Sequence, residues 1–187
     1  MKTTRTSRLN VKIDKLTRSI ELRISGERFD TIIEQIYPSD SKLLDDGAWQ
    51  FDWTFELRQQ QREVYKLTTR ENPTIIQGLI SIEDLGDHVF VHLIESSEFN
   101  KGQQKLFVGV PGNLFAFASK LAFENGYGGT VAFESKTALI PHYQETIGAQ
   151  LLWGIRMLIN TPEALILTRQ YFNDFDSENF DGTQKNT

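Results

Sequence analysis

A glycine-rich turn runs directly into a phenylalanine-rich segment at residues 108–117, which read VGVPGNLFAF. A helix that begins at such a turn leaves its first backbone N–H groups without partners inside the helix, and the helix dipole adds positive potential there. Gly109 and Gly112 allow a ligand to approach the backbone closely. The turn therefore predicts a site for a phosphate-type anion that needs no Lys or Arg, although an ordinary turn before a helix would read the same way.

Other residue types narrow the chemistry. The chain has no cysteine, which excludes disulfides, a thiol nucleophile and cysteine-ligated zinc. His88 and His92 are spaced like a metal pair on one strand, but His142 is the only other histidine, so a polar sheet face fits better than a zinc site. We therefore predict no metal. The sequence also contains no Walker phosphate loop, dinucleotide fingerprint or Ser-His-Asp arrangement.

Strands and helices alternate around the turn and must position it. Short turns join predicted strands at 64–69, 74–82 and 88–95 into an antiparallel meander. The elements predicted after the turn are a helix (113–125), a strand (130–134), a helix starting at 136 or 139 and ending at 147, an extended segment (150–159) and a last helix (162–172). The strand–helix–strand step requires parallel pairing of the strands at 88–95 and 130–134.

The region before the meander is less regular. A strand is predicted at 19–25. Apolar residues three and four apart predict a helix over 28–36, and a second short helix follows at 39–44. The aromatic block at 48–57 fits a strand or a helix, with its rings in the core or in a pocket wall. The fold class is thus α/β (α+β), with a mixed, mostly antiparallel sheet of about six to seven strands flanked by helices.

Size and charge indicate one globular domain at 1–172 and an acidic, disordered tail at 173–187. Eight Lys or Arg in residues 1–28 could indicate a nucleic-acid-binding arm, but they are scattered along a segment that reads as strand and turn, which favours a solvated face. No apolar leader precedes the domain, and Pro111 interrupts the most apolar window. We therefore expect a cytoplasmic protein without a membrane or nucleic-acid partner.

The order of elements over about residues 60–160 resembles the GCN5-related N-acetyltransferase superfamily. In that family a loop with the pattern Q/R-x-x-G-x-G/A follows a strand, and its amides bind the pyrophosphate of acetyl-CoA. The corresponding segments here are LFVGVPGNL, KLAFENGYGG, TVAFE and ALIPHYQETIGA. The chain is similar to a divergent member in either of two registers. If Gly109 is the first motif glycine, Leu106 stands where the family has Gln or Arg and Pro111 replaces the second glycine. If Gly112 is the first, Gly109 stands at the Gln/Arg position and Leu114 ends the pattern.

This resemblance implies an acetyl-CoA-dependent N-acetyltransferase. Tyr143 would be the acid that protonates the leaving sulfur, and Glu95 the candidate base, with Glu98 and His92 as further candidates. A bulge at 94–96 would contact the coenzyme. The implied coenzyme-binding residues are Ile94, Ser96, Val108, Gly109, Val110, Gly112, Asn113 and Leu114.

The acceptor would be a small-molecule or peptide amine, and the net charge of −5 favours a cationic one. An edge strand at 150–159 could pair between two chains and form a homodimer. The departures from the motif motivate an alternative, which is a non-catalytic acyl-CoA-binding or protein-interaction module on the same fold.

Overall fold

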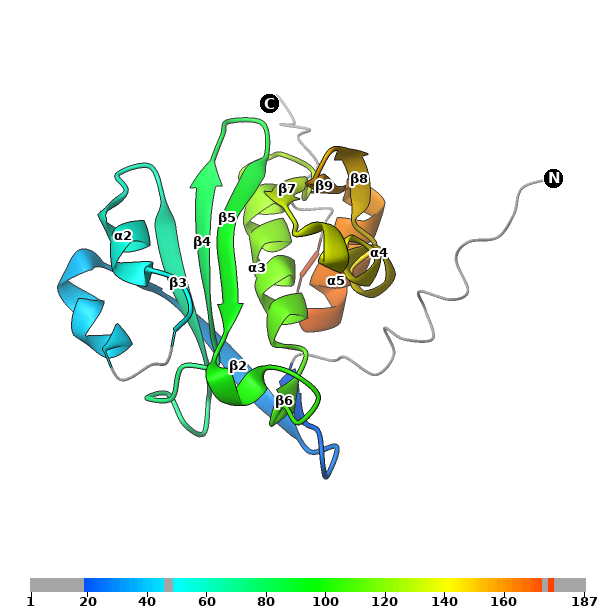
Figure 1. Cartoon of the computed structure of the whole chain (residues 1–187). Coiled ribbons are helices and arrows are strands. Elements are labelled where there is room, and N and C mark those ends of the chain that lie inside the picture. Colours follow the sequence, from blue (N-terminus) through cyan, green and yellow to red (C-terminus); the bar gives the residue numbers. More distant parts are fainter. Residues whose placement is uncertain (1–18, 46–48, 173–174, 177–187) are drawn as a thin grey trace, which may run out of the picture.

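The computed structural model describes residues 19–45, 49–172 and 175–176. Residues 1–18, which hold most of the basic segment, and most of the predicted acidic tail lie outside this part of the chain. Within it, nine strands form one sheet in the order β6-β1-β2-β3-β4-β5-β7-β9-β8 (Figure 1). The mixed, mostly antiparallel sheet confirms the predicted fold class, with more strands than expected.

The strands are β1 (Ser19–Leu22), β2 (Arg28–Ile36), β3 (Glu63–Thr69), β4 (Gly78–Asp84), β5 (Val89–Ser96), β6 (Phe107–Val108), β7 (Val131–Glu134), β8 (Gln150–Trp153) and β9 (Arg156–Ile159). The predicted meander is confirmed as the antiparallel run β3–β4–β5. The predicted parallel pair is confirmed as β5 and β7, and all other neighbouring strands are antiparallel. The predicted extended segment forms the β8–β9 hairpin at one edge of the sheet.

Helices cover both faces of the sheet (Figure 1). One face carries the 3₁₀ helix η1 (Pro38–Leu44) and α2 (Trp53–Arg58), and the other carries α3 (Val110–Glu124), α4 (Ile140–Thr146) and α5 (Thr161–Tyr171). Two further 3₁₀ helices are η2 (Glu98–Asn100) and η3 (Thr137–Leu139). None of the described helices has both the length and the apolarity needed to cross a membrane.

The predicted helix over 28–36 is wrong, because this segment is the strand β2. It pairs with β3 from Thr31 to Ile36. Ile33 packs in the core beneath α3, whereas Ile36 packs in the core beneath α2. A strand with apolar side chains packed against both faces loses the strict apolar–polar alternation, so its apolar spacing also fits a helix. Its run of β-branched residues is typical of a strand.

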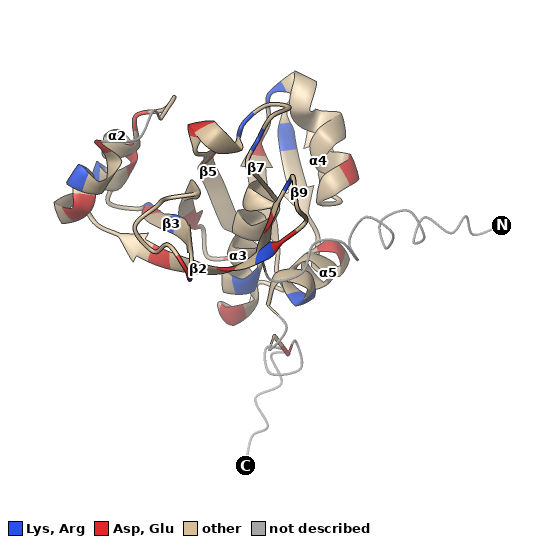
Figure 2. Ribbon diagram, turned by 90° about the horizontal axis from the view of Figure 1, so that it is seen from below, with Lys and Arg blue, Asp and Glu red and all other residues tan. Residues whose placement is uncertain are grey.

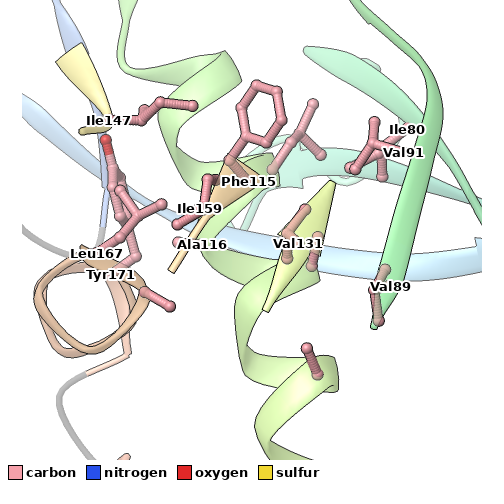
Figure 3. Packing of buried hydrophobic residues seen from close by; sticks show 14 of the residues in the cluster. Ile80, Val89, Val91, Phe115, Ala116, Val131, Ile147, Ile159, Leu167 and Tyr171 are labelled. Carbon is pink, nitrogen blue, oxygen red and sulfur yellow. The ribbon is translucent and has the colours of Figure 1, made fainter. Parts of the chain in front are cut away.

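The larger core lies between the sheet and α3, α4 and α5. Phe115 of α3 packs among Ile80, Val91 and Val131 of the sheet (Figure 3). Tyr171 of α5 belongs to the same cluster and is 4% exposed. A separate cluster of Ile36, Leu44, Trp53, Leu57, Val64 and Leu79 holds η1 and α2 to the opposite face.

Close packing of α3 against α5 explains why a glycine stands at position 112, which is part of the predicted anion site. A Cβ atom on Gly112 would lie 2.5 Å from the hydroxyl oxygen of Tyr171. This distance is far below a van der Waals contact, so a larger residue at 112 would force the Tyr171 side chain or the helix that carries it to shift. Gly112 therefore has a packing role that is independent of any ligand.

We expect Gly112→Ala to lower the free energy of unfolding by about 1–3 kcal/mol, because the new methyl group overpacks the contact with Tyr171. In a Tyr171→Phe background the same substitution should cost less, since the atom that it meets is absent. Urea denaturation of the wild type, both single variants and the double variant measures the coupling. Equal costs in the two backgrounds would contradict this contact.

Candidate active site

A cavity of about 350 Å³ opens between β5 and β7. These strands are paired only along Val89–Val91 and Val131–Phe133. Beyond this point β5 continues to Ser96 beside β4, and no other described strand pairs with its second edge. Backbone N–H and C=O groups of this stretch are therefore available to an extended ligand lying in the cavity.

The other walls come from segments that are distant in the sequence. They include Phe51 before α2, Lys101 after η2, Pro111 in the first turn of α3 and Tyr143 in α4. The aromatic block at 48–57 therefore contributes both to the core and to the cavity wall. Trp53 is buried in the smaller core, whereas Phe51 lines the cavity and is 40% exposed.

The strand β5 contains a bulge beside the cavity. Relative to β4 it carries one extra residue, His92, which has no partner in the register. We expected the bulge at 94–96, and this position is corrected toward the start of the strand. Because the bulge shifts the alternation of side chains, Ile94 packs in the core beneath α3, whereas Glu95 points toward α2.

The first turn of α3 leaves three backbone amides open, but they are not all the ones expected, because the helix begins at Val110 rather than at Asn113. Gly109 caps the helix with a φ of 96°, and the Asn113 N–H is already bonded to the Gly109 carbonyl at 2.9 Å. Pro111 has no N–H, so Gly109, Val110 and Gly112 carry the amides that the helix leaves open. Pro111 itself lines the cavity, which places this turn at the cavity edge.

The remaining coenzyme-binding residues suggested by the sequence fall into two groups. Ile94 and Ser96 line the cavity. Val108 belongs to the edge pair of β6 with β1, Leu114 is fully buried, and the Asn113 side chain donates a hydrogen bond to β2. These three residues do not line the cavity, and Gly109, Val110 and Gly112 do not line it either, so Pro111 alone brings the turn to the cavity edge.

Tyr143 lies in the cavity wall, where the resemblance suggested an acid. Its ring packs edge-on against Phe115 at 5.6 Å and Phe133 at 5.2 Å, measured between ring centroids. Burial raises the pKa of the Tyr143 hydroxyl above its ordinary value. The hydroxyl therefore stays protonated at neutral pH and can donate a proton or a hydrogen bond into the cavity.

Glu95 also lines the cavity, but its carboxylate is fully engaged. Oε1 accepts hydrogen bonds from the Gln50 amide at 2.8 Å and the Lys101 ammonium at 2.7 Å, and Oε2 accepts one from the Trp53 indole at 2.8 Å. Burial by itself would raise the pKa of this carboxyl. The hydrogen bonds from Lys101, Gln50 and Trp53 outweigh burial and hold the pKa below its ordinary value. Such a group is a weak proton acceptor, and it fixes two loops to β5.

Two residues of the site, Gln50 and Lys101, have no local sequence pattern that would predict a functional role. Gln50 and Lys101 line the cavity, and both donate a hydrogen bond to Glu95. His92, which the resemblance suggests as a further candidate base after Glu95, also lines the cavity and bonds to Glu83. No group of three His, Cys, Asp or Glu that could hold a metal ion is found in the described part of the chain.

We expect Glu95→Gln to lower the free energy of unfolding at pH 7 by about 3 kcal/mol, because it breaks a buried, hydrogen-bonded ion pair. The folded-state pKa of Glu95 is depressed, so its stabilisation is complete above the unfolded-state pKa of about 4.3 and is lost as the pH falls through the folded value. The difference between wild type and variant in urea denaturation should therefore shrink below about pH 4. Glu98→Gln is the control, since Glu98 is exposed and 3.5 Å from the same Lys101. Equal losses in both variants would contradict the assigned role.

No family model and no curated protein sequence matches this chain, but solved structures do. A mutant AtaT toxin bound to the C-terminus of the antitoxin AtaR and acetyl-CoA is 16% identical, with a TM-score of 0.53 over 75% of this chain and 99% of that one. AtaT complexed with acetyl-methionyl-tRNAfMet is 14% identical, with a TM-score of 0.53 over 74% and 99%. A chain of the KacTA–DNA complex is 13% identical, with a TM-score of 0.51 over 78% and 100%. The chain therefore has the fold of the GCN5-related N-acetyltransferases, as its motifs predicted.

Proposed function

We propose that this protein transfers an acetyl group from acetyl-CoA to an amine. The observation that carries the proposal is the cavity between β5 and β7, which joins an unpaired strand edge, an open helix N-terminus and the protonated hydroxyl of Tyr143. Each of these features suits a different part of the coenzyme. The fold is shared with AtaT, and one of the matched AtaT structures contains acetyl-CoA, which supports the same proposal.

The residues present fit the coenzyme in two places. The amides of Gly109, Val110 and Gly112 would bind the pyrophosphate, because they are open donors at the positive end of the α3 dipole. The backbone of Ile94 and Ser96 would pair with the amide-rich pantetheine arm along the free edge of β5.

In this proposal an amine attacks the thioester carbonyl. A C–N bond forms and the C–S bond breaks. Tyr143 gives its proton to the leaving sulfur, and burial suits it to this role because its hydroxyl resists ionisation before the reaction.

The acceptor is an amine of a small molecule, a peptide or an aminoacyl group. The aminoacyl group is included among the possible acceptors because a structure of AtaT contains acetyl-methionyl-tRNAfMet. Figure 2 shows Lys and Arg interspersed with Asp and Glu over the described elements rather than gathered on one face. This view shows no broad basic footprint for nucleic acid, and the net charge of −5 favours a cationic amine.

Binding of acetyl-CoA is tested by isothermal titration with variants of Pro111. Pro111→Glu should weaken binding roughly tenfold or more, because it places a negative charge beside the open amides. An acidic residue is favourable in the first turn of a helix, so the variant should remain folded. Pro111→Gln is the matched control and should bind like the wild type. Equal affinities of all three proteins would place the phosphates elsewhere, and no binding by the wild type would end the proposal.

Turnover is followed by release of the coenzyme thiol, and the chain adds no background because it has no cysteine. The acceptors are spermidine, an aminoglycoside, a lysine-containing peptide and an aminoacyl-tRNA. Tyr143→Phe should lower kcat about 100-fold without changing the Kd for acetyl-CoA. The control is Tyr127→Phe, whose hydroxyl bonds to Asp84 outside the cavity. Binding without transfer to any acceptor would favour the non-catalytic module instead.

A further inference from the structure

The bulge in β5 presents the His92 side chain to the cavity, and this side chain is paired with Glu83. The reaction proposed above assigns no role to either residue. His92 is the one residue of β5 without a partner in the register with β4. Its Nε2 lies 2.6 Å from Oε2 of Glu83, and it lines the cavity. Both side chains are about one-fifth exposed, at 20% and 19%. The pair is therefore held away from bulk water but remains open to a ligand in the cavity.

The short contact fixes which nitrogen of His92 carries the proton. A carboxylate can only accept a hydrogen bond, so Nε2 of the neutral ring must carry the hydrogen that Glu83 accepts. Nδ1 then holds the free lone pair. No hydrogen bond to Nδ1 occurs in the described part of the chain, so this nitrogen is free to accept a proton.

The ring of His92 is also oriented by its neighbours. It packs edge-on against Phe90 with centroids 4.8 Å apart. The guanidinium of Arg156 covers the Phe90 ring at 4.8 Å and pairs with Glu134 at 3.3 Å. His92 is thus held between a carboxylate from β4 and an aromatic ring that is itself held in place. This arrangement is typical of a general base with an orienting partner.

The other carboxylates of the site suit this role less well. Glu95 uses both oxygens to hold Gln50, Lys101 and Trp53. Glu134 is 53% exposed at its side chain and paired with Arg156. Glu98 is 69% exposed and does not line the cavity. Among the described residues at the cavity, His92 combines an uncommitted basic atom with a fixed orientation.

We propose that His92 is the general base of the reaction and that Glu83 is the residue that positions it, an inference that rests on the proposed acetyl transfer. As the amine nitrogen bonds to the thioester carbon, Nδ1 of His92 takes a proton from that nitrogen. The C–S bond breaks, and the sulfur takes a proton from Tyr143. Glu83 stabilises the imidazolium that forms. Solvent then returns the proton from His92 to Tyr143.

The test compares His92→Gln with His88→Gln. His88 also bonds to a carboxylate at 2.6 Å, that of Asp87, but lies outside the cavity lining, so it is a matched control. Thiol release from acetyl-CoA is measured with water alone and with the same four acceptors, and the Kd for acetyl-CoA is measured by titration. His92→Gln should lower kcat by about 10²- to 10⁴-fold with an unchanged Kd, whereas His88→Gln should behave like the wild type. Added imidazole should restore part of the activity of a His92→Ala variant.

Four outcomes are distinguishable. Loss of kcat in the His92 variants alone, with rescue by imidazole, supports the assignment. Unchanged kcat in His92→Gln overturns it and leaves acetyl transfer standing. A wild type that binds acetyl-CoA but releases no thiol under any condition overturns both the base and the catalytic function while keeping the coenzyme site. A wild type that binds no acetyl-CoA overturns the proposed function itself, and this assignment with it.

The positioning role of Glu83 has a spectroscopic signature. The chain has three histidines, so the imidazole nitrogens can be assigned by nitrogen-15 NMR. In the wild type the proton of neutral His92 should reside on Nε2. In Glu83→Gln the amide can donate to Nε2 instead, so the proton should shift toward Nδ1 and kcat should fall with an unchanged Kd. A wild-type ring protonated on Nδ1, or a variant with unaltered signals and kcat, would overturn this role.

Discussion

The separation of β5 from β7 after three paired residues determines where the rest of the site lies. Because this pair is parallel, the chain must cross over between the two strands, and α3 makes the crossing. The carboxyl ends of both strands therefore meet at one edge of the sheet. There α3 begins after β5, while η3 and α4 follow β7. One topological constraint thus brings an open helix N-terminus and the helix of Tyr143 to the same gap.

Most of the fold could be predicted from the sequence because its central elements carry local signals. Turn residues marked the meander, and glycines marked the ends of the helices. The strand β2 is not predictable in this way, because it sends apolar side chains to both cores and its apolar spacing then fits a helix as well as a strand. The start of α3 was placed too late, since Pro111 reads as a turn residue although it suits the first turn of a helix. The errors thus fall where local pattern and tertiary burial disagree.

The site was less predictable, since its side chains are held by contacts between distant segments. A Glu at a strand end reads as a solvated group, yet Glu95 accepts hydrogen bonds from Gln50 and Trp53, more than 40 residues away. Local pattern cannot reveal that Lys101, together with these two donors, holds the pKa of Glu95 below its ordinary value. The bulge at His92 is equally hidden, because it depends on the register with β4. Tyr143 and the turn at Gly109 could be suggested because the resemblance concerns the order of elements, which local signals do reveal.

The two groups proposed to move protons approach the gap from opposite faces of the sheet. Tyr143 packs against the core beneath α3, whereas Phe90 and His92 point to the face that carries α2. A thioester bound from the α3 side and an amine arriving from the α2 side can meet only where no strand closes the sheet, which is the gap beyond Val91. Under this mechanism we expect the amine, rather than the coenzyme, to contact the segment around Phe51, which lines the cavity. Because Glu95 anchors that segment to β5, changes in its exposed side chains can alter acceptor selectivity while the coenzyme contacts stay in place.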